Sequence, residues 1–77
     1  MEQKLKTIMA DVFELSSNQI NGTATMDSIE HWDSLKHIEL MMIIEEKFGI
    51  VLETEEMIEM TSFKDIKRIL SNKGIKF

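Results

Sequence analysis

Cysteine, proline and tyrosine are absent from this 77-residue chain, and glycine occurs only three times. Without cysteine the chain has no disulfide framework and no thiolate of its own for covalent chemistry. Folds with many tight turns usually need more glycine and proline, so the composition favours helices joined by short loops. A chain of this length typically forms one domain, and we expect a single domain over residues 1–77.

Long apolar runs are also lacking. No stretch approaches the roughly 20 apolar residues of a membrane-spanning helix. The N-terminal sequence MEQKLKTIMADVFEL carries charges along its length and has no continuous apolar core of the kind found in signal peptides. We therefore expect a soluble, cytoplasmic protein with no membrane span.

Basic residues are scarce in the middle of the chain. Between residues 27 and 59 there are ten acidic side chains and only two basic ones, Lys36 and Lys47, within a whole-chain net charge of −5. Nucleic acids need a basic groove for their phosphates, so this distribution argues against a nucleic-acid partner. It favours basic protein partners, with an ordinary solvated acidic surface as the alternative.

The periodicity of apolar residues predicts an all-α fold, a small four-helix bundle with a short third helix. The predicted helices are about residues 2–15, Ser34 to about Phe48, a third capped by Thr54 and ending near Met60, and a fourth that starts at a Ser62-x-x-Asp65 capping box. Between the first two lies a long loop, whose expected core contacts are Ile20, Ala24, Met26 and Ile29. We expect residues 71–77 to form a basic, flexible tail.

The second predicted helix has more apolar surface than a small core needs. At about 100° per residue, one stripe faces the core and consists of Leu40, Met41, Ile44 and Phe48. A second stripe lies on another side between carboxylates; it consists of Leu35, Ile38 and Met42, bordered by Glu39, Glu45 and Glu46. An exposed apolar strip rimmed by charge usually marks a docking surface. The alternative is that the third helix or the long loop covers it.

Ser34 stands at the edge of this second stripe and at the N-terminus of the helix. Asp33, directly before it, can cap the helix. The backbone N–H groups there are unsatisfied and the helix dipole is positive, so a phosphate attached to Ser34 would be favourably placed.

These features resemble the acyl carrier proteins, whose fold is shared by peptidyl and D-alanyl carrier proteins. The matching residues are Asp33-Ser34-Leu35, Ile38-Glu39-Leu40, Glu45-Glu46, Phe48-Gly49-Ile50 and the Thr61–Ile66 opening of the last helix. The resemblance implies that a phosphopantetheinyl transferase, which supplies the base and Mg²⁺, attaches 4′-phosphopantetheine from coenzyme A to Ser34. It further implies that acyl groups are carried as thioesters on the thiol of this arm.

The resemblance also implies a docking role for the second stripe and its border. Leu35, Ile38, Glu39, Met42, Glu45 and Glu46 match family positions that contact basic, apolar patches of acyl-loading and acyl-processing enzymes. The chain would then be a monomeric carrier with no catalytic activity of its own, serving fatty acid synthesis or a specialised biosynthetic pathway.

Residues on both sides of Asp33-Ser34-Leu35 depart from the usual pattern of fatty acid synthesis carriers. Trp32, after His31, stands where a small residue is common, and Lys36 and His37 follow where an acidic residue often comes first. The departures favour a dedicated pathway, although Trp32 is also explained as a packing residue that fixes the loop.

Other interpretations of the same residues are weaker or remain open. Ser34, His37 and Asp33 suggest a hydrolase only superficially, because there is no Gly-x-Ser-x-Gly elbow. His31 and His37 lack a metal-ligand spacing, and we expect exposed histidines and no metal site. Two alternatives stay open: an aminoacyl, peptidyl or D-alanyl carrier, and an unmodified adaptor that docks through the second helix. The methionines Met9, Met41, Met57 and Met60 either fill the core or allow it to reshape around an acyl chain.

Overall fold

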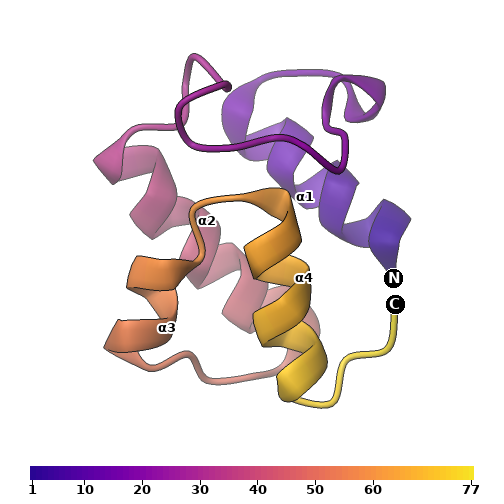
Figure 1. Cartoon of the computed structure of the whole chain (residues 1–77), viewed down its shortest axis with the longest axis vertical. Coiled ribbons are helices and arrows are strands. Elements are labelled where there is room, and N and C mark those ends of the chain that lie inside the picture. Colours follow the sequence, from indigo (N-terminus) through magenta and orange to yellow (C-terminus); the bar gives the residue numbers. More distant parts are fainter.

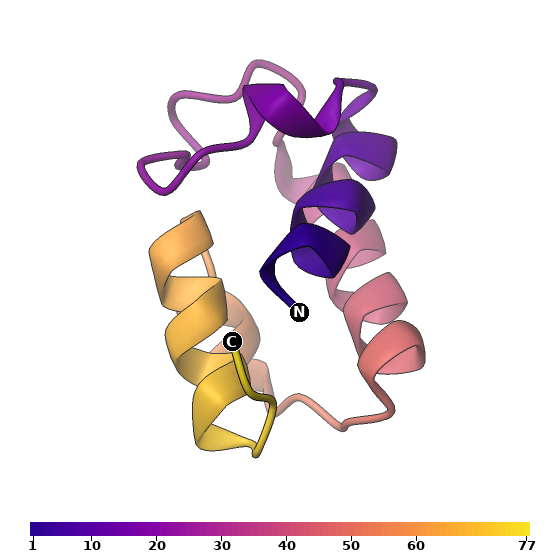
Figure 2. The same ribbon diagram turned by 90° about the vertical axis from the view of Figure 1, so that its right-hand side faces the viewer.

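The computed structural model describes residues 1–77 and contains helices but no β-strand. In chain order the elements are α1 (Glu2–Phe13), the 3₁₀ turn η1 (Ser17–Gln19), α2 (Ser34–Phe48), α3 (Thr54–Glu59) and α4 (Phe63–Asn72). Helix α1 packs against α2 and α3 packs against α4, so two helix pairs face each other (Figures 1 and 2). The predicted four-helix bundle with a long first connection and a short third helix is confirmed.

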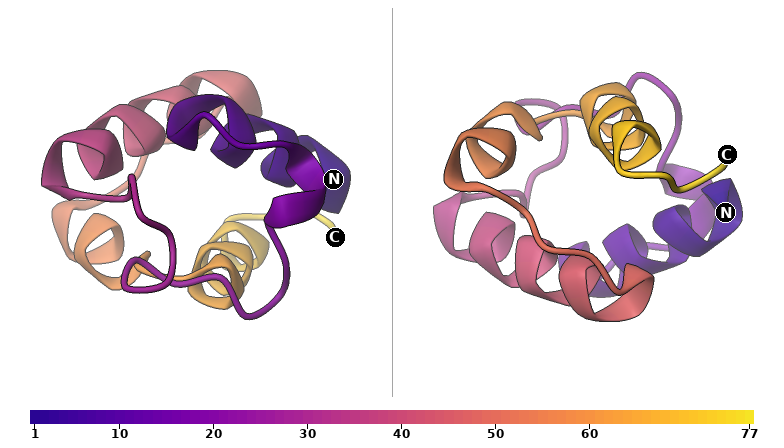
Figure 3. Two further views of the ribbon diagram at one scale, coloured as in Figure 1. Left: turned by 90° about the horizontal axis from the view of Figure 1, so that it is seen from above. Right: turned by 90° about the horizontal axis from the view of Figure 1, so that it is seen from below.

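All four helices are arranged around a common centre, as the end views in Figure 3 show. Nineteen buried residues form a continuous core, and none of them is polar. Helix α2 contributes Leu40, Met41 and Ile44, with Phe48 partly buried beside them, which confirms the predicted inner stripe. No helix is both long and apolar enough to cross a membrane.

The long loop between α1 and α2 is fastened to the core and to the start of α4. Its predicted core contacts are confirmed: three are buried and one is partly buried, namely Ile20, Ala24, Ile29 and Met26. The Met26 N–H donates to the Thr61 carbonyl (2.8 Å), and the Phe63 N–H donates to the Ala24 carbonyl (2.9 Å). Because these bonds satisfy backbone groups on both segments, the loop has a fixed path although η1 is its one short helical turn.

Helix α1 ends at Phe13, two residues before the predicted end near residue 15. Glu14 adopts the left-handed conformation (φ 59°, ψ 44°), which stops the helix. The Leu15 N–H then donates back to the Ala10 carbonyl at 2.9 Å, as in a Schellman motif. Leu15 still packs against the core, which explains why apolar periodicity alone placed it in the helix.

Helix α3 begins with a different cap from the predicted one. Glu53 is the N-cap, Thr54 is the first helical residue, and the Glu56 carboxylate accepts from the Glu53 N–H at 2.8 Å. This bond, together with the nearby Lys73 ammonium, holds the pKa of Glu56 below its ordinary value. The carboxylate therefore stays ionised, and the cap stays intact, until the pH falls below that ordinary range.

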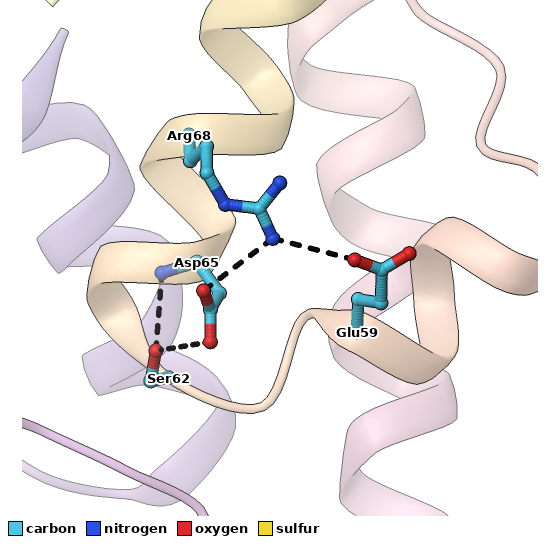
Figure 4. Close-up of polar contacts among 4 residues, drawn as sticks. All are labelled: Glu59, Ser62, Asp65 and Arg68. Atoms are coloured by element: carbon cyan, nitrogen blue, oxygen red, sulfur yellow. Dashed lines mark hydrogen bonds and ion pairs between the residues drawn. The ribbon is translucent and has the colours of Figure 1, made fainter.

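The predicted capping box at the start of α4 is present in a modified form (Figure 4). The Ser62 hydroxyl oxygen accepts from the Asp65 N–H (3.0 Å) and donates to the Asp65 carboxylate (2.9 Å). Arg68 connects this cap to α3, because its guanidinium lies 3.4 Å from Asp65 and 3.5 Å from Glu59. At the other end, α4 runs to Asn72, two residues into the predicted tail.

Gly49 ends α2 in the left-handed region, with φ 65° and ψ 40°. A Cβ atom at this position would meet nothing within 4 Å, so the cost of a side chain comes from the backbone alone. We expect Gly49→Ala to lower the free energy of unfolding by about 1 kcal/mol, measured by chemical denaturation. Gly22→Ala is the matched control, because its Cβ is equally free of neighbours but its φ is not positive. If the free energy of unfolding falls equally in the two variants, the left-handed backbone of Gly49 does not explain the loss.

Candidate functional site

The start of α2 is held by Asp33. This residue has an extended backbone, and its carboxylate accepts from the Lys36 N–H at 2.9 Å. Its carbonyl accepts from the His37 N–H at 2.8 Å. The predicted N-cap is therefore confirmed, and it fixes the first turn of α2 and the residue that follows the cap.

Ser34, the first residue of α2, presents its side chain to solvent. The polar contacts of this turn converge on Asp33, and none involves the Ser34 hydroxyl. The backbone N–H groups of Ser34 and Leu35 have no partner within the chain. The site thus offers a free hydroxyl beside two free donors at the positive end of a helix, a combination that suits an esterified phosphate.

The second apolar stripe of α2 is exposed, as its residue spacing predicts. Leu35, Ile38 and Met42 retain 75%, 60% and 64% of their accessible surface. Neither α3 nor the long loop covers them, so the alternative of a covered stripe is wrong. We call these three residues the apolar strip. It begins next to Ser34 and runs along α2, because its members are spaced by three and four residues.

The three carboxylates that border the apolar strip differ in their surroundings. Glu46 is exposed and has no ion-pair partner, whereas Glu39 lies 3.5 Å from the Lys36 ammonium. Glu45 is partly buried, and its carboxylate accepts from the Leu52 N–H at 2.8 Å. Glu45 therefore stabilises the turn after α2, a role that sequence reasoning missed because the partner lies in a loop seven residues further on.

Apart from Met1 and Phe77 at the two ends of the chain, two other exposed apolar residues were not singled out from the sequence. Val51, in the turn after α2, and Ile58, on α3, retain 72% and 69% of their surface. For Ile58 the sequence held a signal: Met57 and Ile58 are adjacent, and at about 100° per residue only one of them can face the core. Met57 takes the inward position and packs against the core.

Trp32 and the two histidines have distinct environments. Trp32 is 2% exposed and its ring lies 4.9 Å from that of Phe13, which confirms the packing role. His31 is exposed as expected, but the same expectation for His37 is wrong. His37 is partly buried, and its two ring nitrogens contact Trp32 and the Met57 carbonyl. Both ring nitrogens of His37 are thus directed at partners other than Ser34, and no hydrogen bond joins His37 to the Ser34 hydroxyl, so the pair lacks the geometry of a hydrolase.

Comparisons with known proteins agree with this geometry. A family model described as "Phosphopantetheine attachment site" matches residues 3–70. The chain is similar to an acyl carrier protein of Thermosynechococcus vestitus, with 30% identity over 71 residues, covering 92% of this chain and 88% of the relative. It is also similar to an acyl carrier protein of Nitratidesulfovibrio vulgaris, with 30% identity over 73 residues, covering 95% and 96%. A third, from Buchnera aphidicola, is 33% identical over 70 residues, covering 91% and 90%.

Proposed function

The chain belongs to the acyl carrier protein family, and we propose that it carries acyl intermediates as thioesters on a 4′-phosphopantetheine arm esterified to Ser34. The match to the attachment-site family over residues 3–70 carries this proposal. Within that range, Ser34 supplies an exposed hydroxyl in the sequence Asp33-Ser34-Leu35, at the start of a capped helix.

The residues around Ser34 fit a phosphodiester. The Asp33 carboxylate is engaged by the Lys36 N–H and holds the first turn, while the N–H groups of Ser34 and Leu35 remain free to face added negative charge. Attachment forms a bond from the Ser34 oxygen to the pantetheine-side phosphorus of coenzyme A and breaks the P–O bond of its diphosphate. Adenosine 3′,5′-bisphosphate leaves, and the hydroxyl proton goes to the base that the transferase supplies. When bound, the arm supplies the thiol that the cysteine-free chain lacks.

We assign docking to the apolar strip and its acidic border. Exposed apolar side chains between carboxylates fit partner enzymes that present an apolar patch surrounded by basic residues. The phosphopantetheinyl transferase and the enzymes that load and process the cargo are the proposed partners. We place the carrier in the cytoplasm, as a monomer, in fatty acid synthesis or a dedicated biosynthetic pathway.

The proposal is tested by intact mass after incubation with coenzyme A and a promiscuous phosphopantetheinyl transferase. We expect the chain to gain one phosphopantetheinyl group. When a loading enzyme and an activated acyl donor are then added, we expect one further acyl group that hydroxylamine releases, as it does other thioesters. If an adenylating enzyme loads an amino acid instead, the chain is an aminoacyl carrier. An unchanged mass together with intact partner binding identifies an unmodified adaptor and contradicts the proposal.

Charge reversal in the acidic border is expected to slow partner association. Glu39 is exposed and its contact with Lys36 is a surface pair, so Glu39→Lys changes stability little. We expect association with the transferase to slow roughly tenfold at low ionic strength, with the difference fading as salt is added. Glu45 is unsuited to this test because it also binds the Leu52 N–H.

Asp11→Lys makes the same change of charge at an exposed position of α1 and serves as the control. Its association rate should stay close to that of the unchanged protein. Stopped-flow measurement at several salt concentrations compares the two variants. If Glu39→Lys and Asp11→Lys associate with the transferase at equal rates in low salt, the acidic border of α2 is not part of the docking surface.

A further inference from the structure

Two hydrogen bonds at His37 join three separate segments of the chain. The indole N–H of Trp32 lies 3.0 Å from Nδ1 of His37, and Nε2 of His37 lies 2.7 Å from the carbonyl oxygen of Met57. An indole nitrogen only donates, so Nδ1 accepts. A carbonyl only accepts, so Nε2 carries the proton. The contacts therefore require a neutral imidazole protonated at Nε2.

The segments joined by this bridge surround the start of α2. Trp32 directly precedes the Asp33 cap, His37 lies in the first turns of α2, and Met57 belongs to α3. Trp32 is anchored further by its ring contact with Phe13 of α1. Helix α3 has six residues, too few to be stable alone, so its position depends on tertiary contacts of this kind.

We propose that His37 is a positioning residue and a proton-sensitive latch: when neutral it holds Trp32, the residue before the Asp33-Ser34 pair, against α2 and α3, and when protonated it releases Trp32. A second proton must go to Nδ1, where it would point at the indole N–H. Two donors would then face each other, and the bond from Trp32 is lost while the bond to Met57 persists. Histidine is the side chain whose charge commonly changes between about pH 5 and 8, so this is the range over which the latch is tested.

No charged side chain compensates for this loss. The ring of His37 makes no ion pair, and its polar side-chain contacts are Trp32 and the Met57 carbonyl. The charged or titratable groups on the segments around it include Asp11 of α1 and Glu14 after that helix, Glu30 and His31 of the loop, Asp33 before α2, Lys36 and Glu39 of α2, Glu53 before α3, and Glu55, Glu56 and Glu59 of α3. Four of these form ion pairs elsewhere, Lys36 with Glu39, Glu56 with Lys73, and Glu59 with Arg68, and the Asp33 carboxylate accepts from the Lys36 N–H.

The single tryptophan makes the latch directly measurable in the unmodified protein. We expect Trp32 fluorescence to shift to longer wavelength as the pH falls from about 8 to 5, with one transition. Over the same range the indole N–H should exchange with solvent roughly fivefold faster, relative to the intrinsic rate, because one hydrogen bond is lost. The ring ¹⁵N shifts of His37 should report the Nε2–H form at the upper end of the range.

Three variants separate the latch from a merely structural role. In His37→Gln the side-chain amide can accept from Trp32 and donate to Met57 but cannot titrate. We therefore expect Trp32 fluorescence to stay at the shorter wavelength of the hydrogen-bonded state at every pH. His37→Phe removes both hydrogen bonds, so Trp32 fluorescence should lie at the longer wavelength of the released state at every pH. His31→Gln, at the exposed histidine, should keep the transition.

A transition that survives in His37→Gln, or one that disappears in His31→Gln, would overturn the latch. So would an unchanged Trp32 signal across the pH range in the protein itself. The latch concerns the chain before modification and does not depend on attachment at Ser34. Its failure would therefore leave the carrier function untouched, and the mass test of that function is equally independent of His37.

Discussion

Ser34→Ala is expected to abolish phosphopantetheinylation completely while leaving the helical fold intact. The substitution removes a single exposed oxygen that makes no hydrogen bond in the chain. Alanine is the best helix former, and the Asp33 carboxylate still caps the helix through the Lys36 N–H. We therefore expect the free energy of unfolding to change by less than about 0.5 kcal/mol. Intact mass and thermal unfolding measure the two effects.

Ser71→Ala is the matched control for this variant. Ser71 is also exposed and helical, since it lies near the C-terminal end of α4, but it has neither the capped N-terminus nor the neighbouring apolar strip. It should accept the group at the rate of the unchanged protein. Modification that continues in Ser34→Ala, or that is lost in Ser71→Ala, would show that the arm is attached elsewhere.

Ile38→Asp is expected to reduce kcat/KM for phosphopantetheine transfer by roughly 30-fold or more. Ile38 lies between Leu35 and Met42 in the apolar strip and is 60% exposed, so its side chain is available to a partner. A carboxylate at this position would have to lose its water against an apolar patch, which is costly without a paired charge. Because the site is exposed in the free protein, stability should change little.

Val51→Asp provides the comparison for Ile38→Asp. Val51 is 72% exposed and apolar but lies outside α2, in the turn that follows it. We expect its kcat/KM to remain close to that of the unchanged protein. If the two variants lose activity equally, partner recognition depends on general surface apolarity and not on the strip.

Both ends of the helix that carries the candidate site could be predicted closely, Ser34 as its start and about Phe48 as its end, because they depend on local chemistry. Asp33 caps the start and Gly49 supplies the left-handed residue at the end, and both act within a few positions of the chain. The exposure of the apolar strip could be predicted from the residue spacing in the same helix. The spacing gives two apolar stripes, and a small bundle has too few neighbouring helices to cover both. The end of α1 could not be predicted in this way, because Glu14 adopts a conformation that its residue type seldom takes.

Contacts between residues far apart in the chain could not be predicted from the sequence. The bond from His37 to Met57 spans twenty positions, and the bond from Leu52 to Glu45 spans seven and lies partly outside any helix. Both depend on how α3 and the turn before it pack against α2. No local pattern encodes that packing, so His37 was expected to be exposed and Glu45 was assigned only to docking.

The mass of the protein taken from its native cells tests the central claim most directly. The chain should be purified while its pathway is active, and its intact mass and peptide fragments recorded. We expect at least part of the population to carry one phosphopantetheinyl group, with the added mass localised to Ser34. A chain that always has the mass of the bare polypeptide, in cells that modify their other carriers, would contradict the account.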